Sequence, residues 1–407
     1  MMTSTDQTGA LATGPAPETN RLIAVDMLRG LAVLGLMLVH IFVFSQPMDS
    51  VDPRYGLDYA GANAPFIWIQ AVLGVGNFIF LFSMLFGASV LFFDGKHDEP
   101  GLKAGAWLWY QRMFWLAVIG GLHGVLLFFG DILLSYALCG MLGLWWVRNL
   151  SARHLMWIGA GAYALSLIAY LLMTLLMAFL ETNEPEMMAE FSQMQIDGHV
   201  GSFLEGVRYR VLHIAQMMAM FPFMIFWGLA GTMLIGLGLA KQGVLTGQKS
   251  TGFYLKLSVI SLGIGLPLSI AAFAWLQAGD FSSYRSAVWF PVSLLLSVPM
   301  ALGYLGLVML MARSPLFKPV QIALAAVGRM AMSNYLLHSI IGAVIFHGWA
   351  LGYFQQLQFP ELAWILLGTW AANVLFSLVW LHFFRFGPAE WLWRSLTYRK
   401  RQPLLKS

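Results

Sequence analysis

"RLIAVDMLRGLAVLGLMLVHIF", residues 21–42, is the stretch that decides the fold class of this chain. It is long enough and apolar enough to cross a lipid bilayer, because a spanning helix needs about 20 mostly apolar residues. The same stretch carries Asp26 and Arg29 at its start and His40 near its end. Ionisable groups are costly inside a membrane helix, so each of the three requires a structural or chemical reason.

The whole chain has the composition of a multi-span membrane protein. Of its 407 residues, 59% are hydrophobic and 10% are charged, whereas soluble domains carry about 25% charged residues. We therefore predict an all-α fold, a polytopic membrane helix bundle in contact with the lipid bilayer. The net charge of +4 is small, and the basic residues are sorted by membrane side, so no nucleic-acid partner is expected. The single Cys139 excludes an intramolecular disulfide and a cysteine-built metal site, and we interpret it as a packing residue.

Ten segments of the chain are predicted to cross the membrane. Their approximate bounds are 22–45, 65–92, 106–129, 131–148, 153–180, 212–240, 252–277, 286–311, 320–350 and 361–385. The third and fourth segments are joined by a tight turn at Gly130-Asp131, and the ninth is long enough to contain a break near Gly342 or Gly348. Four-residue spacing of Gly228, Thr232 and Gly236 predicts close helix packing in the sixth segment.

These segments are predicted to form a single transmembrane domain over residues 21–398. Residues 1–20 lack the basic and apolar regions of a signal peptide and are predicted to be a disordered cytoplasmic tail, and 399–407 a basic cytoplasmic tail. The long segment 181–211 is predicted to be an extracytoplasmic loop. Its part from residue 187 onward has helical apolar spacing, which indicates either a lid over an outer cavity or a connector that packs on the outer face.

The distribution of basic residues predicts that both termini are cytoplasmic. With the N-terminus placed inside, the 23 Lys and Arg residues fall on the cytoplasmic side except for Arg54, Arg208, Arg210 and Arg285. This asymmetry is what the positive-inside rule describes. Equal sidedness of the two termini also requires an even number of spans.

Arg29 and His40 share one face of the first segment. They are eleven residues apart, which places them within about 20° of the same stripe and about 16 Å apart along the helix axis. Structural explanations stay open for both residues. Arg29 either extends to the membrane surface or forms an interfacial ion pair with Asp26, three residues before it, and His40 is satisfied by a neighbouring helix.

More polar residues collect in other segments. His123 lies near the end of the third segment and Asp131 in the short turn after it, while Arg329, Asn334 and His338 lie in the ninth. Such residues either bond helices to one another or line a shared polar cavity, and their number favours the cavity. No metal site is predicted, because the histidines lie on different segments without a paired-ligand spacing.

Three stretches carry a resemblance to a known family: the opening helix, "HGVLLFFGDILLSYAL" (123–138), and the region from "GRMAMSNYLLHS" (328–339) to "FGPAEWLWRSLTY" (386–398). The chain resembles the YeiB-like bacterial membrane family, whose domain of unknown function carries the number 418. That family is similar to a superfamily of membrane acyltransferases that includes acyltransferase family 3 and the heparan-α-glucosaminide N-acetyltransferase. In family-3 enzymes the first helix carries an arginine, ten intervening residues and a histidine, a pattern that Arg29 and His40 match.

The resemblance implies transfer of an acyl or acetyl group from cytoplasmic acyl-CoA to a glycan or small-molecule acceptor at the bacterial inner membrane. It implies catalytic roles for His40, His123 and Asp131, a homodimer, and a passage lined by solvent between Arg29 and His40. The residues expected near the acyl-CoA are Asp26, Arg29, Arg329, Asn334 and His338. Two alternatives stay open: a proton-coupled exporter of a small metabolite, since histidines titrate near neutral pH, and a non-catalytic scaffold.

Overall fold

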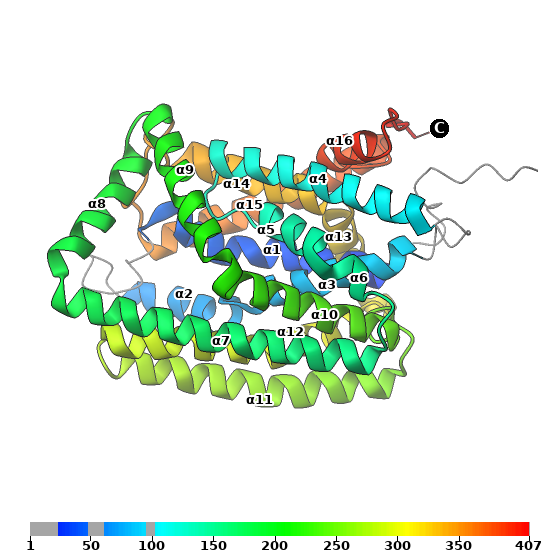
Figure 1. Cartoon of the computed structure of the whole chain (residues 1–407), viewed down its shortest axis with the longest axis horizontal. Coiled ribbons are helices and arrows are strands. Elements are labelled where there is room, and N and C mark those ends of the chain that lie inside the picture. The colour runs from blue at the N-terminus through cyan, green and yellow to red at the C-terminus, as the bar shows by residue number, and fades with distance from the viewer. Residues whose placement is uncertain (1–22, 48–60, 95–101, 407) are drawn as a thin grey trace, which may run out of the picture.

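The computed structural model describes residues 23–47, 61–94 and 102–406, and within these ranges the protein is an all-α bundle without strands. Most helices run along the long axis of the molecule (Figure 1). In chain order the elements are α1 (Ile23–Ser45), η4 (Gly61–Asn63), α2 (Ala64–Ile69), η5 (Gln70–Gly74), α3 (Asn77–Asp94), α4 (Leu102–Leu126), α5 (Leu133–Cys139), η6 (Gly140–Leu144), α6 (Trp145–Val147), α7 (Ala152–Asn183), α8 (Pro185–Val200), α9 (Phe203–Met220), η7 (Phe221–Ile225), α10 (Phe226–Lys241), α11 (Thr251–Gln277), α12 (Ser283–Met311), η8 (Pro315–Phe317), α13 (Lys318–Arg329), α14 (Ala331–Phe346), α15 (Phe359–Phe383) and α16 (Pro388–Thr397).

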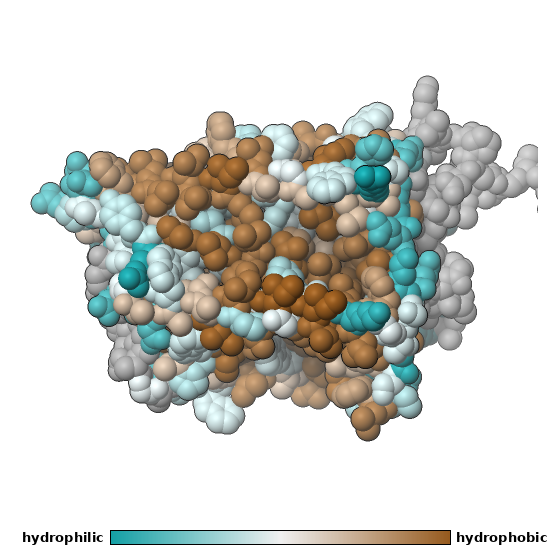
Figure 2. Space-filling model, turned by 90° about the horizontal axis from the view of Figure 1, so that it is seen from below, coloured by the Kyte–Doolittle hydropathy of each residue, from teal (hydrophilic) through white to brown (hydrophobic). Residues whose placement is uncertain are grey.

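The surface of the bundle confirms a membrane protein. In the described residues, seven helical segments are long and apolar enough to span a bilayer, and the shorter Leu133–Val147 and Ala331–Phe346 are also apolar. Figure 2 shows an apolar middle zone with hydrophilic residues at both ends of the long axis. Large apolar side chains that are exposed on the spanning helices include Leu172, Val259 and Trp364. An apolar surface of this extent is compatible with lipid rather than with water.

Glycines let the central helices approach backbone to backbone. A Cβ on Gly30 of α1 would lie 2.0 Å from the Leu324 carbonyl oxygen, and one on Gly328 of α13 would lie 1.8 Å from the Asp26 carbonyl oxygen. The close packing predicted for the sixth segment is confirmed. A Cβ on Gly236 of α10 would lie 2.1 Å from the Met84 carbonyl oxygen of α3. Small residues at such helix crossings allow the two backbones to contact each other directly.

The ninth predicted segment is not one helix. It breaks at Met330 (φ −115°, ψ 34°), between α13 and α14. The predicted break near Gly342 is wrong, because α14 continues through that residue. Gly342 instead makes room for the Phe44 ring of α1, 2.7 Å from where a Cβ would lie. The helix ends at Phe346, two residues before Gly348, which agrees with the alternative position of the predicted break. The second predicted segment is also discontinuous, at Val75-Gly76, where Gly76 has φ +74°.

The predicted loop 181–211 is mostly helical. The connection between α7 and α9 is α8, which crosses one end of the bundle (Figure 1). The helix expected from residue 187 is therefore confirmed. The opposite end, where α1 begins and α15 ends, is called the basic end here. Its basic residues include Arg148, Lys241, Arg313, Arg329 and Arg385.

The two predicted tails differ in what the structure covers. Residues 1–20 lie outside the described ranges. Part of the predicted C-terminal tail packs back on the end of α15, where Lys406 N–H donates to the Phe383 carbonyl at 3.1 Å.

Candidate functional site

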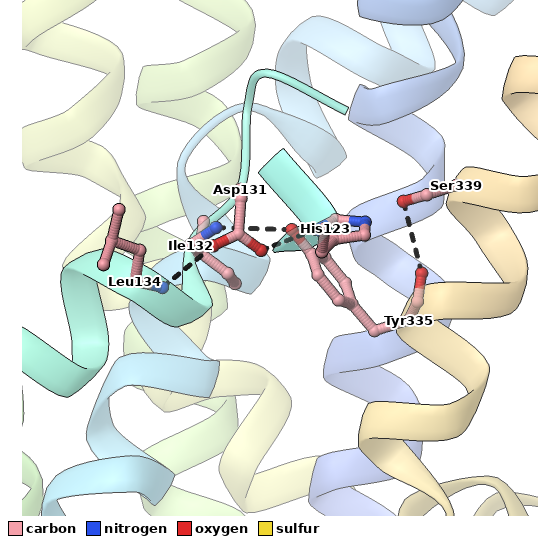
Figure 3. Close-up of polar contacts among 6 residues, drawn as sticks. All are labelled: His123, Asp131, Ile132, Leu134, Tyr335 and Ser339. Atoms are coloured by element: carbon pink, nitrogen blue, oxygen red, sulfur yellow. Dashed lines mark hydrogen bonds and ion pairs between the residues drawn. The ribbon is translucent and has the colours of Figure 1, made fainter. Parts of the chain in front are cut away.

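A buried imidazole–carboxylate pair lies where α4 turns into α5. His123 Nδ1 and Asp131 Oδ2 are 2.6 Å apart, and both side chains are buried (Figure 3). The other carboxylate oxygen of Asp131 accepts from Leu134 N–H at 2.8 Å, in the first turn of α5. Gly120 allows this close approach, because a Cβ there would lie 2.7 Å from Asp131 Oδ1. The predicted tight turn therefore holds Asp131 by both oxygens.

The pair leaves one ring nitrogen of His123 available for chemistry. With Nδ1 held by the carboxylate, Nε2 is the second functional atom of the ring. His123 Nε2 is buried and contacts no hydrogen-bonding partner in the described residues. A carboxylate that orients an imidazole in this way is the arrangement found in catalytic bases.

Aromatic rings join His40 to this pair. The His40 ring lies 4.9 Å from Phe128 and 5.9 Å from Tyr335, measured between centroids. Tyr335 of α14 lies 5.1 Å from the His123 ring, and its hydroxyl accepts from Ile132 N–H at 3.3 Å. We call His40, His123, Asp131, Phe128 and Tyr335 the histidine cluster. The three predicted catalytic residues thus lie in one place, supplied by α1, by α4 and by the turn after α4.

The residues predicted to bind acyl-CoA are not all in one place. Asp26, Arg329 and Asn334 lie around the end of α13, because a Cβ on Gly328 would lie 1.8 Å from the Asp26 carbonyl oxygen and Asn334 Nδ2 donates to the Val327 carbonyl at 3.1 Å. His338 lies one turn further along α14, in the interface with α15. Arg29 Nη1 is 3.2 Å from Asp26 Oδ1, with side chains that are 29% and 4% exposed. The ion-pair interpretation from sequence spacing is therefore confirmed. Arg329 Nη2 donates to the Arg385 carbonyl at 3.5 Å.

The passage expected along α1 is closed in this structure. Val33 and Leu36 lie on the stripe between Arg29 and His40, and they are 0% and 4% exposed in the apolar core. Packed side chains thus separate the guanidinium from the imidazole. Within the described ranges, no group of three or more His, Cys, Asp or Glu side chains is placed to hold a metal ion.

One polar residue that the sequence interpretation missed joins α16 to α14. Glu390 Oε1 accepts from Met332 N–H at 2.7 Å and from Ser333 N–H at 3.1 Å, and Oε2 accepts from the Ser333 hydroxyl. The carboxylate therefore caps the first turn of α14, as negative groups favour helix N-termini. Burial raises the pKa of Glu390, and the hydrogen bonds from Ser333 and Met332 oppose that rise. The stretch "FGPAEWLWRSLTY" contains Glu390, but nothing in its spacing points to a helix 57 residues earlier.

A second group of rings fixes α8 to the bundle. The His199 ring stacks on Phe354 at 4.4 Å and lies 5.3 Å from the His347 ring. The His199 carbonyl accepts from Gly348 N–H at 2.8 Å. Burial lowers the pKa of His199 to about 4. The group also adjoins the histidine cluster, because the His199 ring lies 5.8 Å from Phe129, whose ring lies 5.6 Å from Phe128.

Sequence comparisons place the chain among bacterial relatives. A family described as "Protein of unknown function (DUF418)" matches residues 239–400. The chain is 32% identical over 394 residues to "Uncharacterized protein YeiB" of Escherichia coli (strain K12), covering 95% of this chain and 98% of the relative. It is 28% identical over 416 residues to "Uncharacterized protein YxaH" of Bacillus subtilis (strain 168), covering 96% and 98%. No solved structure matches the chain.

The similarity to the first of these relatives extends over nearly the whole length of both proteins, including the segments that form the histidine cluster. The chain belongs to the YeiB-like family of membrane proteins that contain DUF418.

Proposed function

We propose that this protein is an integral membrane acyltransferase that moves an acyl group from acyl-CoA to the hydroxyl or amine of an acceptor. The observation that carries this proposal is the buried His123–Asp131 pair, 2.6 Å apart, with His123 Nε2 left without a partner beside His40. A neutral imidazole held by a carboxylate takes a proton efficiently at physiological pH. The Phe128 and Tyr335 rings pack against His123, and an apolar environment strengthens such electrostatic interactions.

In the proposed reaction the histidine cluster acts on the acceptor. His40 or His123 takes the proton of the acceptor hydroxyl or amine as that group attacks the thioester carbonyl. A bond from oxygen or nitrogen to the acyl carbon forms and the carbon–sulfur bond breaks. The CoA thiolate leaves and takes up a proton from solvent, so the acceptor's proton stays on the imidazole until it is released to solvent. Asp131 keeps the His123 ring in one tautomer and stabilises its protonated form.

The basic end is the proposed site for the phosphates of acyl-CoA. Arg29, Arg329 and Arg394 are supplied there by three different helices, and the Arg112 guanidinium stacks on Trp393 at 4.0 Å. Guanidinium groups bind phosphate oxygens in bidentate geometry. The positive-inside rule then supports a cytoplasmic basic end, cytoplasmic termini and a location in the bacterial inner membrane. Because Val33 and Leu36 close the stripe on α1, access of the acyl arm requires these side chains to move.

Ligand-dependent stability tests the proposal directly. A ligand that binds only the folded state raises the unfolding temperature, so acetyl-CoA should protect the detergent-solubilised protein. His123→Ala and His40→Ala should lose transfer of label from acetyl-CoA. His382→Ala, at an exposed position near the end of α15, is the matched control and should behave as wild type. The proposal fails if acetyl-CoA neither protects the protein nor transfers its label to any acceptor in a membrane extract.

Discontinuous helices support a second candidate function. The break at Gly76 lies within the candidate span Ala64–Leu91, and discontinuous spans are a feature of many secondary transporters. A proton-coupled exporter would move solute in proteoliposomes under an imposed pH gradient and would show no protection by acetyl-CoA. The homodimer implied by the resemblance stays a prediction, which mass photometry in nanodiscs would test.

A further inference from the structure

A row of buried polar side chains follows the interface between α14 and α15. Asn334 Nδ2 donates to Ser377 Oγ at 2.8 Å. One helical turn further on, the Asn373 amide contacts His338 Nε2. We call these four residues the polar seam. All four are 0% exposed, although they lie in two apolar helices.

The seam contains more hydrogen-bonding atoms than its contacts use. Asn334 Oδ1, Asn373 Oδ1 and His338 Nδ1 are buried and have no partner in the described residues. Leaving one such atom unsatisfied costs about 1–3 kcal/mol. Folded proteins avoid that cost by binding ordered water, which needs polar partners of this kind.

The two ends of the seam lie in different environments. At one end His338 lies one turn along α14 from Tyr335, whose ring lies 5.9 Å from the His40 ring, and His40 Nδ1 is also buried without a partner in the described residues. At the other end Asn334 donates to the Val327 carbonyl of α13 at 3.1 Å, beside the break at Met330. Ser333, in the first turn of α14 next to this break, donates its hydroxyl to Glu390 of α16. The seam therefore runs from the histidine cluster toward the basic end.

We propose that the polar seam binds a short file of water molecules that exchanges protons between the histidine cluster and the basic end. An imidazole N–H passes its proton to the adjacent water, each water passes one on, and one proton leaves at Glu390 for each that enters. No bond to carbon changes in this step. A buried base works repeatedly only if the proton it has taken is released to solvent. The interface between α14 and α15 contains polar atoms that can bind water along such a route, whereas Val33 and Leu36 on the α1 stripe are apolar and buried. The inference applies equally to an acyltransferase and to a transporter.

Hydroxyl-radical footprinting of the full-length protein in nanodiscs tests the inference. X-ray irradiation forms radicals from water, and a buried side chain is oxidised rapidly only where water is bound beside it. Trp109 is the dry reference, since it is 0% exposed and packed in the apolar core. We expect His338 to be oxidised several-fold faster than Trp109, although tryptophan is intrinsically the more reactive side chain. Equal or slower oxidation of His338 in the wild-type protein overturns the inference.

Variants of α15 link the water to the seam. The double substitution Asn373→Leu and Ser377→Ala removes polar atoms that face α14, so oxidation of His338 should fall to the level of Trp109. Leu375→Ala, at a lipid-facing position of the same helix, should leave it unchanged. If His338 is oxidised equally in both variants, the water does not belong to the seam. Neither measurement requires CoA, so its failure is distinguishable from failure of the proposed acyl transfer.

Discussion

The imidazole of His123 and the carboxylate of Asp131 lie 2.6 Å apart inside an apolar helix bundle. Two features of the chain impose this distance: α4 ends within a turn of His123, and the first turn of α5 holds the other Asp131 oxygen. Burial of an ionisable pair is costly unless each group has a defined partner. The end of α4 therefore positions His123, and the backbone at the start of α5 positions Asp131.

Asp131→Asn should abolish acyl transfer while preserving the fold. The asparagine oxygen still accepts from Leu134 N–H, but its amide donates to His123 Nδ1 and shifts the ring proton to Nε2. The same exchange in a catalytic triad lowers turnover by about 10⁴-fold. Label transfer from acetyl-CoA measures the loss, and protection by acetyl-CoA should persist. Wild-type turnover in Asp131→Asn would show that the carboxylate does not orient a base.

Glu390→Ala should destabilise the bundle through α14. The substitution leaves Met332 N–H, Ser333 N–H and the Ser333 hydroxyl without their acceptor. Unsatisfied buried groups cost about 1–3 kcal/mol each, so the unfolding temperature should fall clearly in thermal melts. Glu186→Ala on the exposed face of α8 is the control. Equal melting of the two variants would contradict the capping role.

Gly328→Ala should separate α1 from α13. The added Cβ would lie 1.8 Å from the Asp26 carbonyl oxygen, and overpacking of this kind costs about 1–3 kcal/mol or more. Gly368→Ala on α15 is the matched control, because its Cβ would meet nothing within 4 Å and alanine favours a helix by about 1 kcal/mol. Thermal unfolding should rank Gly368→Ala at or above wild type and Gly328→Ala well below it.

Acid should loosen α8. Burial lowers the pKa of His199 from 6.5 to about 4, so the folded protein resists protonation of this ring. The contribution of the neutral ring to stability is complete above pH 6.5 and is lost as the pH falls toward 4. The positive charge of the nearby Arg210 also opposes protonation of His199. The rate of hydrogen–deuterium exchange of residues 185–200, corrected for the intrinsic exchange rate at each pH, should therefore rise as the pH is lowered from 6.5 toward 4.

His199→Phe keeps the stack on Phe354 but removes the titrating group. Exchange in α8 of this variant should depend less on pH than in wild type. A pH dependence that is identical in the two proteins would assign the effect to other groups.

Local patterns in the sequence were sufficient for several features. The apolar segments predicted the helices, because the requirement to satisfy backbone groups in lipid acts on each segment separately. The three-residue spacing of Asp26 and Arg29 made an ion pair one of two explanations for Arg29, since both lie on one helix face, and the structure contains that pair. The turn at Gly130-Asp131 was predictable because it separates two apolar runs.

Only the tertiary structure decided which polar residues meet. Asn334 pairs with Ser377, 43 residues away, and Glu390 caps a helix 57 residues before it. The break at Met330 involves neither glycine nor proline, and it coincides with the Glu390 cap contributed by a distant helix. Val33 and Leu36 are buried because neighbouring helices pack against this face of α1, which the sequence of α1 alone does not specify. Hydropathy and spacing act along one helix, whereas partners across an interface depend on how whole helices pack, which no single segment encodes.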